Sequence, residues 1–142
     1  MQAIYSGHSV YHAVYHIVFV TKYRRKVLNP AFAKYASSVV KEIAESIDGV
    51  LIEELNIQID HAHIVMVIPP RYAVSKVVEI VKSQSTKVIR KKFPWLNKVY
   101  FGTSSLWSVG YFVSTVGVNE EAIKNYVKYQ QKQDLGQAKL EL

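Results

Sequence analysis

One short stretch limits the fold of this chain more than any other. Two histidines separated by one alanine, His61 and His63, open an apolar run over residues 64–68. Pro69 and Pro70 then end the run, because proline cannot donate a hydrogen bond to a sheet ladder. The stretch therefore predicts a buried β-strand with both histidine side chains on one face, about 7 Å apart along the backbone.

This histidine pair has two interpretations. The rings can converge on one metal ion, since neutral imidazole is a common metal ligand. Alternatively, both rings are structural and their nitrogen atoms are hydrogen-bonded at a strand edge. The spacing of His61 and His63 is compatible with both, so their partners elsewhere in the chain decide between them.

The other segments have the periodicity of an α+β protein. Three further segments are predicted to be strands: 11–20 and 107–116, which are rich in β-branched and aromatic residues, and 50–59, in which apolar and polar residues alternate towards the end. Three have apolar residues at helical spacing: 29–48, 73–92 and 120–133. Residues 93–105 are expected to form a loop. The order predicts a ferredoxin-like βαββαβ fold, an antiparallel sheet with two helices on one face.

The last helix is additional to that fold. It, or a second subunit, is expected to cover the open face of the sheet, to which the histidines would point. With 142 residues, of which 49% are hydrophobic, the chain is expected to be one domain over residues 1–142. A flexible tail is expected from about residue 134 to residue 142.

Composition excludes several kinds of chemistry. The chain has no cysteine, which excludes disulfides, thiolate metal sites and cysteine nucleophiles. No segment has the roughly 18 consecutive apolar residues of a membrane span, and no signal peptide is recognisable, so an intracellular, cytoplasmic protein is expected. The net charge of +7 suits a polyanion such as nucleic acid, although many small basic domains bind none.

Two groups of basic residues are candidates for contacts with DNA phosphates. The first lies in the loop after the first strand and comprises Lys22, Arg24, Arg25 and Lys26. The second lies on the polar side of the second helix and comprises Lys76, Lys87 and Arg90. A solvated turn and a solvated helix face would have the same composition.

The last predicted helix carries two further candidate site residues. Tyr126 and Gln130 are four residues apart and lie on one helix face. A metal held by two imidazoles and an amide oxygen would keep positions open for phosphate oxygens, and it could polarise a phosphodiester. A phenol beside it can act as the nucleophile.

Together these segments resemble a known family, the single-tyrosine HUH transposases, which are the TnpA-type enzymes of single-strand insertion sequences. The resemblance covers roughly residues 11–133, in family order. The matching segments are 15–26, 60–70, 82–87, 107–112, 115–117, and Asn125 and Tyr126 with Gln130.

The resemblance implies a role for each candidate residue. His61, His63 and Gln130 would hold a divalent metal, Mg²⁺ or Mn²⁺, although imidazole ligands favour softer ions. Tyr126 would cleave single-stranded DNA, giving a 5′-phosphotyrosine and a free 3′-hydroxyl. A second 3′-hydroxyl would then join new ends without ATP. The DNA would carry hairpins at the element ends, and the enzyme would be a homodimer whose active sites combine histidines and tyrosine from different subunits.

Some residues and functions stay open at this stage. Tyr129 resembles the second tyrosine of two-tyrosine replication initiators, but it is expected to pack. His12 and His16 are too far apart along a strand to chelate one ion, so they are expected to be structural or close to DNA. A non-catalytic nucleic-acid-binding module and a domesticated relative of the transposases are the alternative functions.

Overall fold

The computed structural model describes residues 3–6, 9–11 and 13–136. The strands are β1 (Ile4–Ser6), β2 (Ser9–Tyr11), β3 (Val14–Val20), β4 (Leu51–Ile57), β5 (His61–Val67) and β6 (Phe112–Ser114). The helices are η1 (Lys22–Arg24, a single 3-10 turn), α1 (Pro30–Glu45), α2 (Val74–Lys92), α3 (Leu96–Val99) and α4 (Glu120–Asp134).

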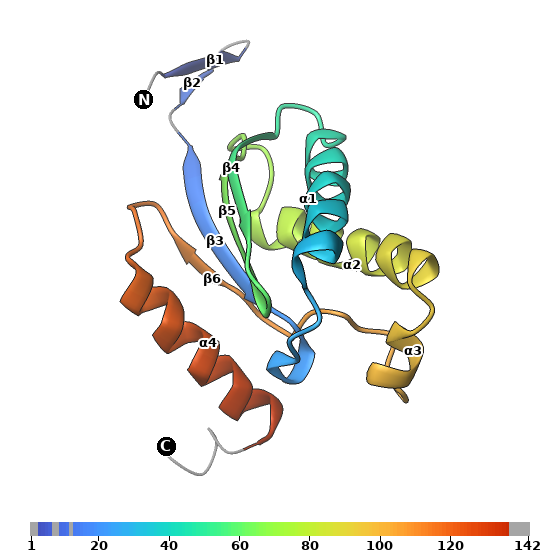
Figure 1. Cartoon of the computed structure of the whole chain (residues 1–142). Coiled ribbons are helices and arrows are strands. Elements are labelled where there is room, and N and C mark those ends of the chain that lie inside the picture. The colour runs from blue at the N-terminus through green and yellow to red at the C-terminus, as the bar shows by residue number, and fades with distance from the viewer. Residues whose placement is uncertain (1–2, 7–8, 12, 137–142) are drawn as a thin grey trace.

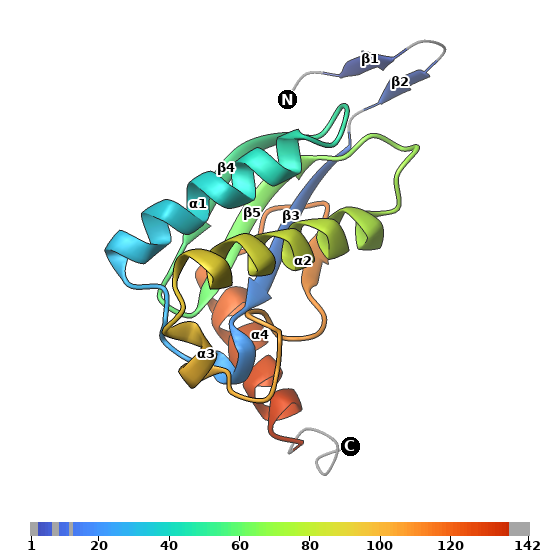
Figure 2. The same cartoon turned by 90° about the vertical axis from the view of Figure 1, so that its right-hand side faces the viewer.

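The main sheet has four antiparallel strands in the order β4-β5-β3-β6. Helices α1 and α2 cover one face of it, and α4 lies on the opposite face (Figures 1 and 2). Strands β1 and β2 pair with each other in a separate hairpin. The predicted ferredoxin-like α+β fold with an additional C-terminal helix is therefore confirmed.

The register of β3 against β5 separates two kinds of side chain. Val18 pairs with His63 and Val20 pairs with His61, so all four side chains lie on the face that α4 covers. Ala62, between the histidines, lies on the opposite face and is fully buried towards the helices. Strand β5 thus directs its two histidines towards α4 and its small apolar residue towards α1 and α2.

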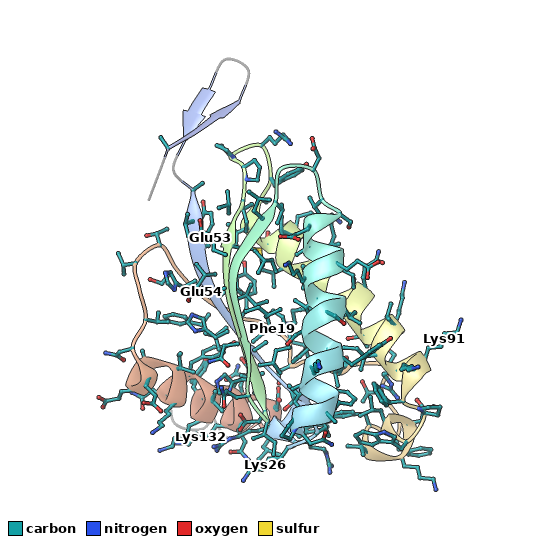
Figure 3. The ribbon with its side chains drawn as sticks, turned by 45° about the horizontal axis from the view of Figure 1, so that its top comes forward. Phe19, Lys26, Glu53, Glu54, Lys91 and Lys132 are labelled. Carbon is teal, nitrogen blue, oxygen red and sulfur yellow. The ribbon has the colours of Figure 1, made fainter. Side chains whose placement is uncertain are left out.

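The core lies between the sheet and helices α1 and α2. Asn29 caps α1 by accepting a hydrogen bond from the Phe32 amide at 3.0 Å. Phe19 points into this layer from β3, whereas Lys91 points outward at the end of α2 (Figure 3). None of the helices described here is long and apolar enough to cross a membrane.

Several predicted boundaries are wrong, and backbone geometry explains one of them. The predicted strand 107–116 shortens to β6, because Gly110 has a φ of +95° and interrupts the extended chain. Trp107 makes only an isolated bridge to Thr21. The predicted loop 93–105 contains α3. The predicted strand 11–20 is divided, because Tyr11 ends β2 and β3 starts at Val14. Strand β4 ends at Ile57, two residues before the predicted end.

The predicted tail starts too early. Asp134 is the last residue of α4 and its side chain is buried. Residues 137–142, the greater part of the predicted tail, lie outside the described residues.

Candidate active site

The His63 ring lies half-buried in the middle of the sheet face covered by α4. Its Nε2 atom is buried and has no hydrogen-bond partner among the residues that the structure describes. Burial, and then the nearby His16, lower the pKa of His63. The ring is therefore neutral over an extended pH range, which is the state in which an imidazole nitrogen can bind a metal.

The His61 ring is held by the carboxylate of the preceding residue, Asp60. Its Nδ1 lies 2.8 Å from Oδ1 of Asp60, and Asp60 is only 6% exposed. Arg24 donates from Nε to the other carboxylate oxygen at 3.0 Å. The hydrogen bond with His61 is the largest of the effects that lower the pKa of Asp60. Since the carboxylate is an acceptor, the His61 proton belongs on Nδ1, and Nε2 keeps its lone pair.

A third histidine lies next to this pair. The ring centroids of His16 and His63 are 5.7 Å apart, and Nδ1 of His16 is buried without a hydrogen-bond partner in the described chain. His16 is therefore part of the site's surroundings. His12, the other histidine of the first predicted strand, lies outside the described residues.

Helix α4 carries the tyrosine. Asn119 caps it by accepting a hydrogen bond from the Ala122 amide. The Tyr126 hydroxyl donates to Oε1 of Gln130 at 3.1 Å, so the two side chains share one face as predicted, and Gln130 is only 4% exposed. Burial, followed by the negative charge of Asp134, raises the pKa of Tyr126 well above its ordinary value.

The two halves of the predicted site lie on the same side of the sheet but are not bonded to each other. Within residues 13–136, no hydrogen bond or ion pair joins Tyr126 or Gln130 to His61 or His63. Nor do the described residues contain a group of three or more His, Cys, Asp or Glu side chains that could hold a metal. The potential ligand set is therefore two imidazoles and one amide.

Asp134 anchors the C-terminal end of α4. Its Oδ2 accepts hydrogen bonds from the Tyr23 amide at 2.9 Å and from the Ser108 hydroxyl. Its Oδ1 accepts a long hydrogen bond of 3.4 Å from the amide of Gln130 and lies 3.8 Å from Nζ of Lys22. This buried carboxylate thus ties the tyrosine helix to η1 and to the segment before β6.

In the first basic group, two residues pair with buried carboxylates and two are exposed to solvent. Arg24 and Lys22 are engaged with Asp60 and Asp134, as described above. Arg25 and Lys26 are exposed, and the Arg25 guanidinium lies 5.7 Å from the Tyr23 ring. Contacts of this group with DNA stay a prediction.

The second basic group is also mixed. Lys76 is exposed and lies 4.0 Å from Glu79. Arg90 donates hydrogen bonds to the carbonyl oxygens of Thr103 and Ser105 and so fixes the loop after α3. Lys87 is exposed. Contacts of these residues with DNA likewise stay a prediction.

Lys87 borders two adjoining cavities between α2 and residues 102–111. Their volumes are about 490 and 560 Å³. Both are lined by Thr86, Lys87 and Ser104, so they form one continuous groove. The cavity of about 490 Å³ reaches Gly110, where a Cβ atom would lie 3.6 Å from Oε1 of Gln130. The groove therefore ends beside the tyrosine helix.

Sequence reasoning missed two acidic residues of the site. The sequence pattern assigns no role to Asp60, and it places Asp134 in the predicted tail. In each case a signal was present, because Asp60 directly precedes the first histidine and Asp134 follows Gln130 by one helical turn. The expectation that Tyr129 packs is wrong, since it is 51% exposed.

Comparison with known proteins identifies the family of this chain. The family model described as "Transposase IS200 like" matches residues 9–130. The chain belongs to this family, the IS200-like transposases, and is thereby a DNA-processing enzyme of DNA transposition.

Individual relatives match over most of their length. The transposase for insertion sequence element IS200 of Salmonella typhimurium is 32% identical over 128 residues, which are 90% of this chain and 83% of the relative. The ISDra2 transposase TnpA of Deinococcus radiodurans is 28% identical over 122 residues, covering 85% of this chain and 86% of the relative.

Solved structures show the same fold. A crystal structure of a Deinococcus radiodurans protein assigned as a transposase has a TM-score of 0.80 and 27% identity, covering 89% of this chain and 97% of that one. A REP-associated tyrosine transposase bound to a REP hairpin has a TM-score of 0.54 at 13% identity, covering 97% and 77%. At that identity the second likeness concerns the fold alone.

Proposed function

We propose that this transposase cleaves and rejoins single-stranded DNA through a covalent bond to Tyr126, with a divalent metal held by His61, His63 and Gln130. One observation carries the proposal. The Tyr126 hydroxyl is hydrogen-bonded to the Gln130 amide oxygen, on a helix that covers the sheet face bearing both histidines.

The proposed step exchanges one phosphoester bond for another. The Tyr126 oxygen attacks a backbone phosphorus and loses its proton, and the bond from phosphorus to the 3′ oxygen breaks. The DNA 5′ end is then linked to the tyrosine, and the leaving 3′ oxygen takes up a proton. Attack by a second 3′-hydroxyl reverses the step and joins new ends, so no ATP is needed.

The residues present fit a metal. Nε2 of His63 is buried without a partner among the described residues, and Nε2 of His61 is left free by the bond to Asp60. Gln130 adds an oxygen donor. Two nitrogens and one oxygen suit Mn²⁺ at least as well as Mg²⁺. When bound, such an ion would polarise the phosphate and favour ionisation of a phenol whose pKa is raised.

The proposed DNA partner is single-stranded and carries hairpins. Membership of the IS200-like transposases supports a DNA partner, and a protein of the same fold, the REP-associated tyrosine transposase, binds a REP hairpin. The groove between α2 and residues 102–111 is the proposed path of unpaired DNA, because it is bordered by Lys87 and Arg90 and ends beside Gln130. Exposed Arg25, Lys26 and Lys76 would add phosphate contacts away from it, while Lys22 and Arg24 contribute positive charge from their bound positions.

The proposed enzyme acts inside the cell as a homodimer with active sites shared between subunits. The observation that supports sharing is the lack of a direct hydrogen bond or ion pair from Tyr126 or Gln130 to either histidine within residues 13–136. Mixing a His61→Ala, His63→Ala chain with a Tyr126→Phe chain tests it. Shared sites predict recovered activity in the mixed dimer, and inactive mixed dimers would contradict sharing.

The decisive experiment is an adduct assay. Protein, a hairpin-bearing single-stranded oligonucleotide and Mg²⁺ or Mn²⁺ are expected to give a covalent product that survives denaturation. Tyr126→Phe should abolish the product, and the control Tyr129→Phe should leave it intact. An undiminished adduct with Tyr126→Phe would reject Tyr126 as the nucleophile. Metal-independent binding with no adduct under any condition would favour the alternative, a non-catalytic or domesticated nucleic-acid-binding protein.

A further inference from the structure

Asp60 connects the first histidine to the rest of the molecule. Its two carboxylate oxygens have different partners: Oδ1 lies 2.8 Å from Nδ1 of His61, and Oδ2 accepts from Nε of Arg24 at 3.0 Å. The carboxylate is almost completely buried, so both partners are needed to satisfy it. The His61 ring is consequently held in one orientation and one tautomer.

Arg24 extends this connection to the tyrosine helix. Its Nη1 atom donates to Oε1 of Gln131 at 3.2 Å, and Gln131 is the neighbour of Gln130 on α4. One guanidinium therefore bonds the carboxylate behind a histidine and an amide on the helix that carries the nucleophile. A continuous chain of hydrogen bonds runs from His61 through Asp60 and Arg24 to Gln131.

We propose that Asp60 and Arg24 are positioning residues, which fix the His61 ring for a divalent metal and make this fixation depend on the docking of α4. The inference rests on the proposed function, because it concerns a residue assigned there as a metal ligand. It goes further by linking the two halves of the site through side chains that are neither the proposed metal ligands nor the nucleophile.

The chemistry of the two side chains fits these roles. A carboxylate that accepts the second ring proton of a ligating histidine orients the ring and raises its basicity, and loss of such a partner typically weakens metal binding about 10- to 100-fold. Arginine has a planar fork of donors, so it can serve Asp60 and Gln131 at once. A lysine has one ammonium at the end of a flexible stem and cannot replace this geometry.

The first test observes the His61 ring directly. Long-range ¹H–¹⁵N correlation spectra of the full chain, with the His61→Ala spectrum for assignment, report which ring nitrogen carries the proton. The native chain is expected to hold the proton on Nδ1. Asp60→Ala should give a mixture of tautomers, and Asp60→Asn, which preserves size, should lie between. An unchanged tautomer in Asp60→Ala would overturn the role of Asp60.

The second test measures affinity for Mn²⁺ alone, without DNA, from the electron paramagnetic resonance signal of the free ion. Asp60→Ala is expected to bind about 10- to 100-fold more weakly than the native chain. Gln131→Ala, which removes only the link to α4, should weaken binding several-fold. The control Gln133→Ala lies on the same helix and is exposed, so its affinity should be native.

Two results would overturn the proposal. One is native Mn²⁺ affinity in Asp60→Ala, and the other is equal affinity of Gln131→Ala and Gln133→Ala, which would remove the coupling to α4. Circular dichroism and melting curves verify that each variant is folded, and Arg24→Gln tests the same chain of bonds without altering Asp60. Failure of the proposed function would look different, because the unaltered chain would then give no adduct dependent on Tyr126.

Discussion

The buried carboxylate of Asp134 is expected to hold the tyrosine helix in place, so Asp134→Ala should release α4 without unfolding the sheet. The carboxylate accepts hydrogen bonds from the Tyr23 amide and the Ser108 hydroxyl, and its side chain is only 3% exposed. Both donors lie outside α4. The helix itself buries few residues, chiefly Val127 and Gln130, so its docking depends strongly on this anchor.

The magnitude follows from the bonds lost. Hydrogen bonds to a charged group contribute about 1.5 kcal/mol each at the lower end of their range. Two of them give about 3 kcal/mol, and the ion pair with Lys22 at 3.8 Å adds less than about 1 kcal/mol. A loss of about 3 kcal/mol shifts the equilibrium between docked and undocked helix by roughly 100-fold.

Hydrogen–deuterium exchange of peptides covering residues 120–134 measures this equilibrium. In Asp134→Ala their protection should fall roughly 100-fold, while peptides from β3 and β5 keep theirs. Asp48→Ala is the matched control, because the Asp48 side chain is exposed and pairs with Arg71 at the surface. Unchanged protection of α4 would refute the anchor, and an equal loss throughout the sheet would show that Asp134 stabilises the whole fold.

Three further predictions concern backbone and charge. Gly110→Ala should lower the free energy of unfolding in urea by about 1–2 kcal/mol, because Gly110 has a φ of +95°, although its surroundings leave room for a methyl group. The control Gly117→Ala, at a glycine in open space, should lower it little. Burial lowers the pKa of Lys82 to about 8, so the unfolded state binds more protons than the folded state between about pH 8 and 10.5. The free energy of unfolding of the unmutated protein should therefore rise relative to that of Lys82→Met as the pH increases through that range. Equal pH dependence of the two chains would contradict this. Because burial raises the pKa of Tyr126, its phenol in the metal-free chain should still be un-ionised at about pH 10, which an ultraviolet titration of the native chain against Tyr126→Phe would measure; ionisation of Tyr126 below about pH 10 would argue against a buried phenol.

The sequence predicted the architecture well, because periodicity determines which residues can share a buried face. The alternation around Ala62 placed both histidines on one face, and helical spacing placed Tyr126 beside Gln130. Predicted boundaries were wrong where the backbone conformation of a single residue, or a very short element, determines the secondary structure. A glycine with positive φ shortened the last strand, and the short helix Leu96–Val99 has too few residues to show a period.

The supporting residues of the site were harder to predict, because their roles arise from pairs distant in the chain. Arg24 and Asp60 are 36 residues apart, and Ser108 and Asp134 are 26 apart. A basic loop looks the same in sequence whether its charges face DNA or a buried carboxylate. Only the fold shows that Arg24 and Lys22 are held by acidic side chains, whereas Arg25 and Lys26 remain exposed.

The turn that receives α4 has one more consequence. Tyr23 and Arg24 both have positive φ, at 58° and 54°, a conformation that costs a residue with a Cβ roughly 1–2 kcal/mol. Both are also bonding partners of α4, Tyr23 through its amide and Arg24 through its side chain. If the helix departs, this turn is free to relax, and the relief offsets part of the lost bonding. The net free energy that holds the helix is therefore smaller than its hydrogen bonds alone would give, and a smaller value would favour an exchange of helices between two subunits.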